Sequence, residues 1–423
     1  MSVRLMSCLI GVLVVIGYSH LTLAAEELTW QDCLREAAKN HPDLIASQEG
    51  VTQEEAAKTI AASNELPQIT ADLNASSAQS KHSGASNSFN YGASGTQLLF
   101  DGLKTVNNIK AASENVKAAR ENFRFTSTDV RHRLRAAFIN LLKAHELVNL
   151  TQEIYNIRKS NLDLITLRYQ SGTEHKGALL TAQANLSQAS FEINQARRGV
   201  ETAERQLIKE LGRTQFSPVT VKGSFDMNDD VLQKPDFEIL AKDHPSLLKI
   251  AAQKNAASFD VKANEGDFWP DVSLTGGVSK ADSRWPPQET VTSAGVKVSW
   301  PLFEGGLRLA KVAQAKSVYR QLTEEERSAR DGIVLSLQQN WSVLQDSVES
   351  VKVQKDFLNA VEERAKIAEQ QYAVGLISFD NWTIIEDDLV KNKKLFLDVQ
   401  TNALLAEANW IQARGETIEY EKE

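Results

Sequence analysis

The sequence has only two cysteines in 423 residues, and this scarcity limits the covalent chemistry of the chain. Cys8 lies in the predicted amino-terminal signal segment, so Cys33 is alone once that segment is removed, and an intrachain disulfide is excluded. A catalytic thiol also needs a lowered pKa and a basic partner, and nothing in the sequence indicates such a partner for Cys33.

The signatures of enzymes and cofactor sites are missing as well. The sequence has no glycine-rich phosphate loop and no dinucleotide-binding fingerprint. Its acidic runs, Glu324–Glu326 and Glu386–Asp388, are expected on solvated helix faces. The histidines after the amino-terminal segment lack metal-ligand spacing; they are His41, His82, His132, His145, His175 and His244. We therefore predict no enzymatic activity, no cofactor and no metal.

The balance of charge gives no reason to expect a nucleic acid partner. The chain has 47 basic and 55 acidic residues, for a formal net charge of −8. One dense basic run, RHRLR at Arg131–Arg135, permits an anion-binding interpretation, but a solvated helix face is the favoured one.

Long apolar runs are also scarce, because only Leu9–Tyr18 qualifies. Arg4 precedes this run and the small residues of Thr22–Ala25 follow it, which predicts a secretory signal peptide over residues 1–25. An uncleaved anchor is disfavoured because the run is short. A lipoprotein site at Cys8 is disfavoured because this cysteine precedes the apolar core. No later segment predicts a transmembrane helix.

What the sequence does contain is an internal repeat with a fixed offset of 203 residues. Leu98–Ala112 reads LLFDGLKTVNNIKAA, and Pro301–Ala315 reads PLFEGGLRLAKVAQA. Such self-similarity indicates duplicated architecture. Further pairs match without a gap: His41 and His244, Pro42 and Pro245, Pro67 and Pro270, Tyr169 and Tyr372, Gly172 and Gly375, Gly212 and Gly415.

Each repeat is predicted to contain a helix, a β-hairpin, a long helix and a return helix. The predicted divisions are a first repeat at 26–212 with its hairpin at about 67–100, a connector at 213–231, a second repeat at 232–415 with its hairpin at about 270–303, and a short tail at 416–423.

The hairpins follow from strict alternation of apolar and polar residues. Ile69–Ser76 and Val272–Ser279 alternate in this way, which is typical of strands with one wet face. The polar segments Ser80–Asn87 and Asp282–Glu289 turn the chain between strands of about a dozen residues. The helix that precedes the first hairpin is expected over Thr29–Asn64.

After Gly102 and Gly305 the apolar pattern becomes helical and continues for more than sixty residues. A helix of this length spans on the order of 100 Å. Gly172 and Gly375 then permit a turn into a return helix. A coiled-coil seam is predicted at Leu337, Trp341, Leu344, Val348, Val351, Leu358, Ala365 and Tyr372, and at their equivalents Leu134, Phe138, Leu141, His145, Val148, Tyr155, Leu162 and Tyr169. Within this seam His145 is expected to be a packed core residue.

Four strands cannot form a closed barrel by themselves. They leave two unpaired edges, which lipid does not tolerate, and single-chain barrels start at eight strands. Two copies would give eight strands and a filled interior, whereas three copies would give twelve strands and a lumen. Aromatic residues at the strand ends suit a membrane interface: Phe100, Trp269, Trp300 and Phe303. The alternative is a pair of surface hairpins on a soluble protein.

The ordered set of repeated motifs resembles the TolC-like outer-membrane efflux proteins, also called outer-membrane factors. The motifs are NHP and DHP at Asn40 and Asp243, LP and WP at the first strand of each hairpin, LFDG and LFEG after the second strand, and YQSG and YAVG at the helical turns. The resemblance covers essentially the whole chain after the signal segment.

This resemblance implies a mainly α-helical protein with membrane β-strands. In such proteins a homotrimer forms a 12-stranded β-barrel in the outer membrane of a Gram-negative bacterium, and a coiled-coil α-helical barrel continues it across the periplasm. It would act as a passive exit duct for an inner-membrane transporter that is joined through a periplasmic adaptor protein. Small-molecule efflux and type I protein secretion both fit. The alternative function is an outer-membrane-anchored coiled-coil stalk without a lumen.

The resemblance also implies site residues at the two helical turns. The turns would form the periplasmic tip and contact the adaptor through Tyr169, Ser171, Gly172 and Thr173, and through Tyr372, Val374, Gly375 and Leu376. Asp380 and Asn381 are the candidate entrance gate, although Asp380 also suits a helix amino terminus. Some relatives carry an arginine where this chain has Ile377, so a gate locked by charges is in doubt.

Overall fold

A computed structural model of the chain describes residues 26–80, 84–225 and 234–418. The predicted signal peptide (1–25) lies outside the described residues, as does the end of the predicted tail. The elements are β1 (Glu26–Leu28), α1 (Trp30–Asn40), α2 (Pro42–Ser63), β2 (Gln68–Ser80), β3 (Gly84–Phe100), α3 (Lys104–Gln170), α4 (Lys176–Leu211), β4 (Val219–Val221), α5 (Phe237–Lys242), α6 (Pro245–Gly266), β5 (Asp271–Asp282), β6 (Glu289–Ser299), α7 (Leu307–Ala373) and α8 (Phe379–Ala413).

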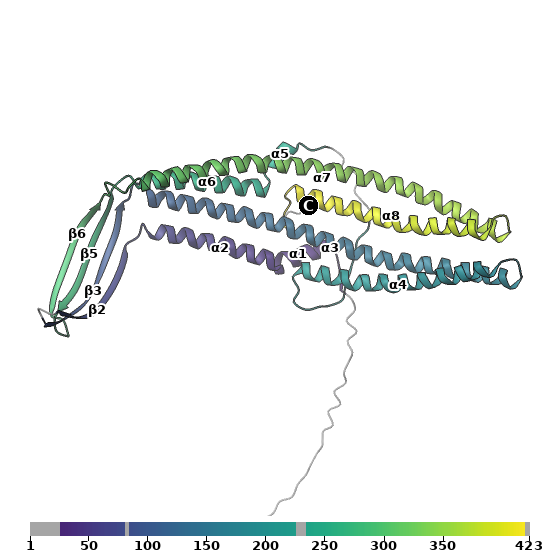
Figure 1. Cartoon of the computed structure of the whole chain (residues 1–423), viewed down its shortest axis with the longest axis horizontal. Helices are drawn as coiled ribbons and strands as arrows, with labels where there is room; N and C mark the ends of the chain where they lie inside the picture. The colour runs from purple at the N-terminus through teal and green to yellow at the C-terminus, as the bar shows by residue number, and fades with distance from the viewer. Residues whose placement is uncertain (1–25, 81–83, 226–233, 419–423) are drawn as a thin grey trace, which may run out of the picture.

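The molecule is elongated, with a β-sheet at one end and two helical turns at the other (Figure 1). The helices α3 and α7 have 67 residues each and run the length of the helical part. Near the sheet the neighbours lie in the order α2, α3, α6, α7; toward the turns the order is α4, α3, α8, α7. Among the described residues, no helix is both long enough and apolar enough to cross a bilayer.

The helix expected over Thr29–Asn64 is divided in two, so that expectation is wrong in detail. Pro42 lacks an N–H group and holds the preceding residue in extended backbone. His41 accordingly has φ −67° and ψ 124°, and it separates α1 from α2. Its Nδ1 accepts a hydrogen bond from the backbone N–H of Asp43 at 3.2 Å and so caps α2. His244 caps α6 in the same way, so both histidine–proline pairs start a helix.

The four long strands form one antiparallel sheet in the order β2–β3–β5–β6. In the first hairpin the strands run further than predicted. β2 extends to Ser80 and β3 resumes at Gly84, so most of the segment predicted as a turn, Ser80–Asn87, is strand. β3 has 17 residues, with a register shift between Leu98 and Phe100.

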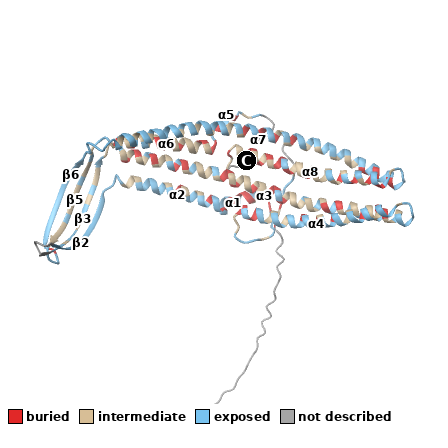
Figure 2. Cartoon of the chain, in the orientation of Figure 1, coloured by how far each residue is buried: buried red, intermediate tan, exposed pale blue. Residues whose placement is uncertain are grey.

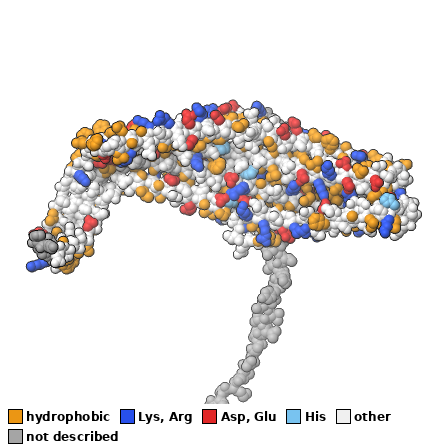
Figure 3. Space-filling model, in the orientation of Figure 1, with side chains coloured by type: hydrophobic (Ala, Val, Ile, Leu, Met, Phe, Trp, Pro, Cys, Tyr) orange, Lys and Arg blue, Asp and Glu red, His pale blue; other side chains and the backbone are white. Residues whose placement is uncertain are grey.

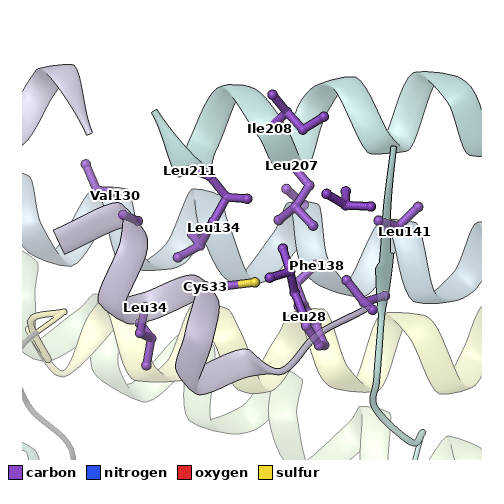
Figure 4. Packing of buried hydrophobic residues seen from close by; sticks show 14 of the residues in the cluster. Leu28, Cys33, Leu34, Val130, Leu134, Phe138, Leu141, Leu207, Ile208 and Leu211 are labelled. Atoms are coloured by element: carbon purple, nitrogen blue, oxygen red, sulfur yellow. The ribbon is translucent and has the colours of Figure 1, made fainter. Parts of the chain in front are cut away.

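A compact core joins the start of the chain to the connector in the middle of the molecule. β1 pairs in parallel with β4, which lies in the segment predicted as a connector. Cys33 is fully buried there among Leu134, Phe138 and Leu207 (Figure 4). Burial, with the charges of Glu36 and Asp32, raises the pKa of the thiol to about 12. Cys33 is therefore a protonated packing residue.

The predicted seam is correct in part. Its members Leu337, Trp341, Leu344, Val348, Ala365 and Tyr372 are buried, as are Leu134, Phe138 and Leu141 in the first repeat. Figure 2 shows in red that buried residues recur along the long helices. Beyond Leu141 the two repeats differ, because Ile154 and Ile165 are buried whereas Tyr169 is 38% exposed. This difference follows from the helices that pack beside α3 and α7. α3 lies between α4 and α8 and buries two stripes, whereas among the described residues α7 packs against α8 alone at that end.

Candidate functional site

One face of the sheet is mainly apolar and the other mainly polar, with Gln97, Thr292, Lys280 and Asp282 as polar residues on the mainly apolar face and Leu98 and Val291 as apolar residues on the other. Residues that pair directly across an antiparallel ladder point to the same side. Leu73 pairs with Tyr91, and Leu274 pairs with Val296. The same face carries Ile69, Ala71, Ala75, Phe89, Ala93, Val272, Val278, Ala294 and Val298. The opposite face carries Thr70, Asp72, Asn74, Ser94, Ser273, Thr275, Ser293 and Lys297.

Bulky side chains stand exposed where the sheet meets the helices. Trp269 is 61% exposed, Trp300 is 58% exposed and Phe303 is 89% exposed. The indole Nε1 of Trp300 donates a hydrogen bond to the carbonyl oxygen of Phe268 at 3.2 Å, which fixes the ring. Figure 3 shows hydrophobic side chains gathered at this junction. Exposed aromatic rings at the ends of apolar strands suit the boundary between hydrocarbon and water.

The far end of the molecule is formed by two tip turns, at residues 171–175 and 374–378. In each turn a glycine has the left-handed conformation, with φ +75° at Gly172 and φ +82° at Gly375. The N–H of Thr173 donates to the carbonyl of Arg168 at 2.9 Å, and the N–H of Leu376 donates to that of Gln371 at 2.8 Å. These bonds close the helix ends and require a glycine conformation at the turn.

The tip residues predicted from the sequence are in different environments. Ser171 and Thr173 are exposed, and each hydroxyl group donates to the carbonyl oxygen of Arg168, at 2.9 and 3.0 Å. Val374 and Leu376 are apolar and 72% and 74% exposed, so they face outward from the second turn. The structure thus brings the predicted residues together at one end of the molecule.

Tyr372 anchors the tip from inside, whereas its equivalent Tyr169 lies at the surface. The ring of Tyr372 stacks on Trp382 with centroids 4.3 Å apart and an interplanar angle of 12°. The guanidinium carbon of Arg168 lies 4.7 Å from the centre of the same ring, and Glu174 accepts a hydrogen bond from the phenol. Burial and this bond raise the pKa of Tyr372.

Sequence reasoning did not identify Arg168, Glu174 and Trp382, although all three hold the tip together. Arg168 also donates from Nη1 to the carbonyl oxygens of Tyr372 and Ala373, at 3.0 and 3.3 Å, so it joins the first repeat to the second. The sequence offered one indication of their role, because each of the three residues lies within ten positions of a tip glycine. The pairing across 200 residues was not readable from one sequence.

The gate candidates Asp380 and Asn381 are both exposed in the first turn of α8. The backbone N–H of Asn381 donates to the hydroxyl of Ser378, the N-cap residue, at 3.4 Å. Ile377 is partly buried against a hydrophobic cluster that includes Tyr372 and Trp382, so this position packs as an apolar residue. No function is tested by these contacts, and the gate role stays a prediction.

Two predictions of solvated faces are wrong for particular residues, although Asp387 and Asp388 of the acidic run remain 57% and 40% exposed. Glu386 is only 5% exposed, and its Oε2 accepts a hydrogen bond from Asn161 at 3.3 Å. Burial raises its pKa. The side chains of Arg131 and Arg135 are 12% and 23% exposed, so the RHRLR run is largely covered. Both predictions failed because α8 packs over α3, a contact between distant parts of the chain.

Comparison with known proteins agrees with the fold described above. The sequence model of the family described as outer membrane efflux protein matches residues 33–213 and 238–416 of the chain. The Brucella suis outer membrane efflux protein BepC is 25% identical over 395 residues, which cover 93% of this chain and 86% of BepC.

Two further proteins are similar over different extents. The Pseudomonas aeruginosa alkaline protease secretion protein AprF is 22% identical over 205 residues, or 46% of this chain and 42% of AprF. A crystal structure of CusC, reported with conformational changes that accompany folding and transmembrane channel formation, superimposes with a TM-score of 0.82. It is 17% identical and the match covers 91% of both chains, so this likeness shows the fold.

Proposed function

Because the chain belongs to the outer membrane efflux protein family, we propose that three copies of it form the outer-membrane exit duct of a Gram-negative export system. The duct is passive, and an inner-membrane transporter supplies the energy. The β-sheet lies in the outer membrane and the helices extend into the periplasm.

One observation carries this proposal: the sheet has an apolar face and two open edges. The apolar face runs across all four strands, from Ile69 on β2 to Val298 on β6. Within the described residues, β2 and β6 each pair with a single strand. Unpaired backbone groups are not tolerated in hydrocarbon, so neighbouring copies must supply the missing partners. Three sheets of four strands make twelve, with the polar face toward a lumen.

The outermost helices lie on the same two sides of the molecule as the edge strands of the sheet. β6 leads into α7, the outermost helix on one side, and β2 follows α2, the outermost helix on the other. Both edges carry exposed apolar side chains, with Phe357 60% and Val353 55% exposed on α7, Ile60 69% exposed on α2, and Phe191 52% exposed on α4. An interface of one edge against the opposite edge is head-to-tail, and such interfaces form a ring when the rotation between copies closes, which a barrel in the membrane requires. The same ring therefore closes both the barrel and the helical tube.

The tip turns are the proposed contact with a periplasmic adaptor and the proposed entrance. Val374 and Leu376 present apolar side chains at the end of the tube, where a partner can cover them. Asp380 lies within the first turn of the following helix and is exposed, so a ring of three such carboxylates would face entering ions. Tyr372, Arg168 and Glu174 hold the two turns of each copy together behind this surface.

The cargo is a small molecule or a secreted protein. BepC is named as an efflux protein and AprF as a protease secretion protein, and this chain resembles both.

Conductance in planar bilayers tests the proposal. Purified protein in a non-ionic detergent should be a trimer by native mass spectrometry, and it should conduct ions after insertion into a bilayer. Empty detergent is the control. A stable monomer, or a trimer that inserts without conducting, would instead favour a solid coiled-coil stalk.

A further inference from the structure

A cavity of about 200 Å³ lies in the middle of the molecule, between α1, α3 and α8. It is far from the tip turns and from the sheet, so neither the duct nor the gate uses it. Its walls contain both apolar and charged side chains. Trp30, Ala408 and Ile411 contribute apolar surface, whereas Arg131 and Arg135 contribute positive charge and Glu407 contributes one carboxylate.

The two arginines face the cavity from the same side of α3. They are four residues apart, and such positions are neighbours on a helix face. Arg131 has protein partners, because its Nη1 donates to the carbonyl oxygen of Thr417 at 2.8 Å and its Nη2 lies 3.7 Å from Glu416. Arg131 therefore adds positive charge while it is held in place.

Arg135 has a weaker set of partners. The nearest carboxylate oxygen belongs to Glu407 and is 3.8 Å away, beyond hydrogen-bond distance, and the described residues give the guanidinium no hydrogen bond. Burial lowers the pKa of Arg135, Glu407 opposes this, and Arg131 adds to it. The charge is thus largely buried beside a carboxylate that pairs with it but does not accept a hydrogen bond from it, and an acceptor that bonds to its N–H groups would offset part of the cost of burial.

The orientation of Arg135 is fixed by aromatic rings. Its guanidinium carbon lies 4.9 Å from the centre of Trp30 and 5.8 Å from that of Phe138. Stacking of this kind uses the face of the guanidinium group and leaves the N–H groups at its edge for a planar acceptor such as a carboxylate.

The basic pair is particular to the first repeat. At the offset of 203 residues, Val334 and Gln338 stand in place of Arg131 and Arg135 on the equivalent long helix. The second copy therefore forms the same helix without a basic pair.

We propose that this cavity binds a small organic carboxylate, with the carboxylate at the edge of Arg135 and a hydrocarbon body against Trp30 and Ile411. The volume is below the range of drug-sized ligand sites, which suits a molecule with a single ring or a short chain. The apolar wall distinguishes such a ligand from inorganic phosphate. The bound acid would fasten α1 and α8 to α3 at the middle of the tube.

Titration calorimetry on the full-length purified protein tests the site. The probe is cyclohexanecarboxylate, with its neutral isostere cyclohexanecarboxamide and inorganic phosphate as comparisons, and empty detergent as the blank. The wild-type protein should bind cyclohexanecarboxylate saturably with a Kd of about 1 mM or tighter, and the amide and phosphate at least tenfold more weakly. Arg135→Gln should weaken carboxylate binding by about tenfold or more, because charge-assisted hydrogen bonds are lost.

Two further variants make the result specific. Arg120→Gln removes an arginine from the same helix, outside the cavity and paired with Glu55 at 2.8 Å, and it should bind as the wild type does. If Arg135→Gln does not fold, Arg135→Lys keeps the charge but loses the planar fork, and it should also bind more weakly. The proposal is overturned if the carboxylate does not bind saturably, if phosphate binds equally well, or if a folded Arg135 variant binds like the wild type.

Discussion

The phenolic hydroxyl of Tyr372 donates a hydrogen bond to Oε2 of Glu174 at 2.7 Å, across 198 positions of the sequence. This contact joins the end of α7 in the second repeat to the turn after α3 in the first. The two repeats were identified by a shared offset, but here they touch through residues that do not correspond. The tip is therefore held by a contact between residues that do not occupy equivalent positions in the two repeats.

Removing that hydroxyl should loosen the tip without removing its core. Tyr372→Phe keeps the ring on Trp382 but loses a hydrogen bond to a charged acceptor, a contribution of about 1.5–3 kcal/mol. Amide hydrogen exchange in residues 171–175 and 374–378 should accelerate by about tenfold or more. The matched control is Tyr169→Phe, which changes the equivalent, exposed residue and should leave exchange unchanged. Equal effects in both variants would remove Tyr372 as the anchor.

The difference between these two tyrosines also shows which features could be predicted from the sequence and which could not. The alternation in the strands and the offset of 203 predicted the hairpins, the long helices and the positions of the tip glycines, because these depend on local periodicity. The burial of Tyr372 and the exposure of Tyr169 depend on which helices flank α7 and α3. That arrangement is set by packing between distant segments, so the equivalence of positions did not extend to equivalence of environment.

The burial of charged residues likewise could not be predicted from the sequence. Glu386 and Arg135 were predicted on solvated faces because runs of charge usually are, yet α8 and α3 cover both. In contrast, the break at His41 could have been predicted, since the proline that follows it disfavours helix at the preceding residue.

A bulky residue at the second tip turn should impair export while trimers still form. Gly375 has φ +82°, and a Cβ added there would meet no other atom within 4 Å, so the penalty of Gly375→Val is conformational, at about 1–3 kcal/mol. Export should fall in cells, and native mass spectrometry should still show trimers. Gly199→Val, at a helical glycine of α4 that also has open space, is the control and should export normally. Normal export by Gly375→Val would argue against the placement of the tip.

Neutralising the candidate gate should change the ion preference of the channel. Asp380 is exposed in the first turn of α8, and a trimer would place three such carboxylates at the entrance. Asp380→Asn should reduce cation selectivity in planar bilayers, and the difference should shrink as salt is raised because the charges are screened. Asp356→Asn, which removes an exposed carboxylate from α7 more than four helical turns before the tip, should leave selectivity unchanged. Identical selectivity in Asp380→Asn and wild type would exclude this residue from the gate.

A lysine should be harmful on one face of the sheet and tolerated on the other. Leu274 lies on the apolar face and pairs with Val296, whereas the adjacent Thr275 lies on the polar face and pairs with Gly295. Lysine facing the bilayer midplane costs about 2–4 kcal/mol, and lysine facing a lumen does not. Leu274→Lys should therefore reduce the amount of trimer in the outer-membrane fraction, while Thr275→Lys should assemble normally. The reverse order would mean that the apolar face does not contact lipid.

The buried carboxylate of Glu386 should make the stability of the tube depend on pH. Burial raises its pKa above the value of an unfolded glutamate, and the nearby Glu369 and Asp387 act in the same direction. A group whose pKa is higher in the folded state stabilises the fold below its unfolded pKa, and this contribution is lost as the pH rises through the folded pKa. Ionised Glu386 is therefore a cost at neutral pH, which Asn161 reduces by donating a hydrogen bond at 3.3 Å.

Glu386→Gln removes this cost and keeps an acceptor for Asn161, so it should raise the melting temperature of the trimer at pH 7. The gain should shrink as the pH approaches the ordinary value for glutamate, about 4.3, because the wild-type group is then protonated as well. Glu363→Gln, whose side chain is 66% exposed on α7, should show no such trend. A pH-independent gain would mean that Glu386→Gln acts through packing, because only ionisation links the stability of the tube to the proton concentration over this range.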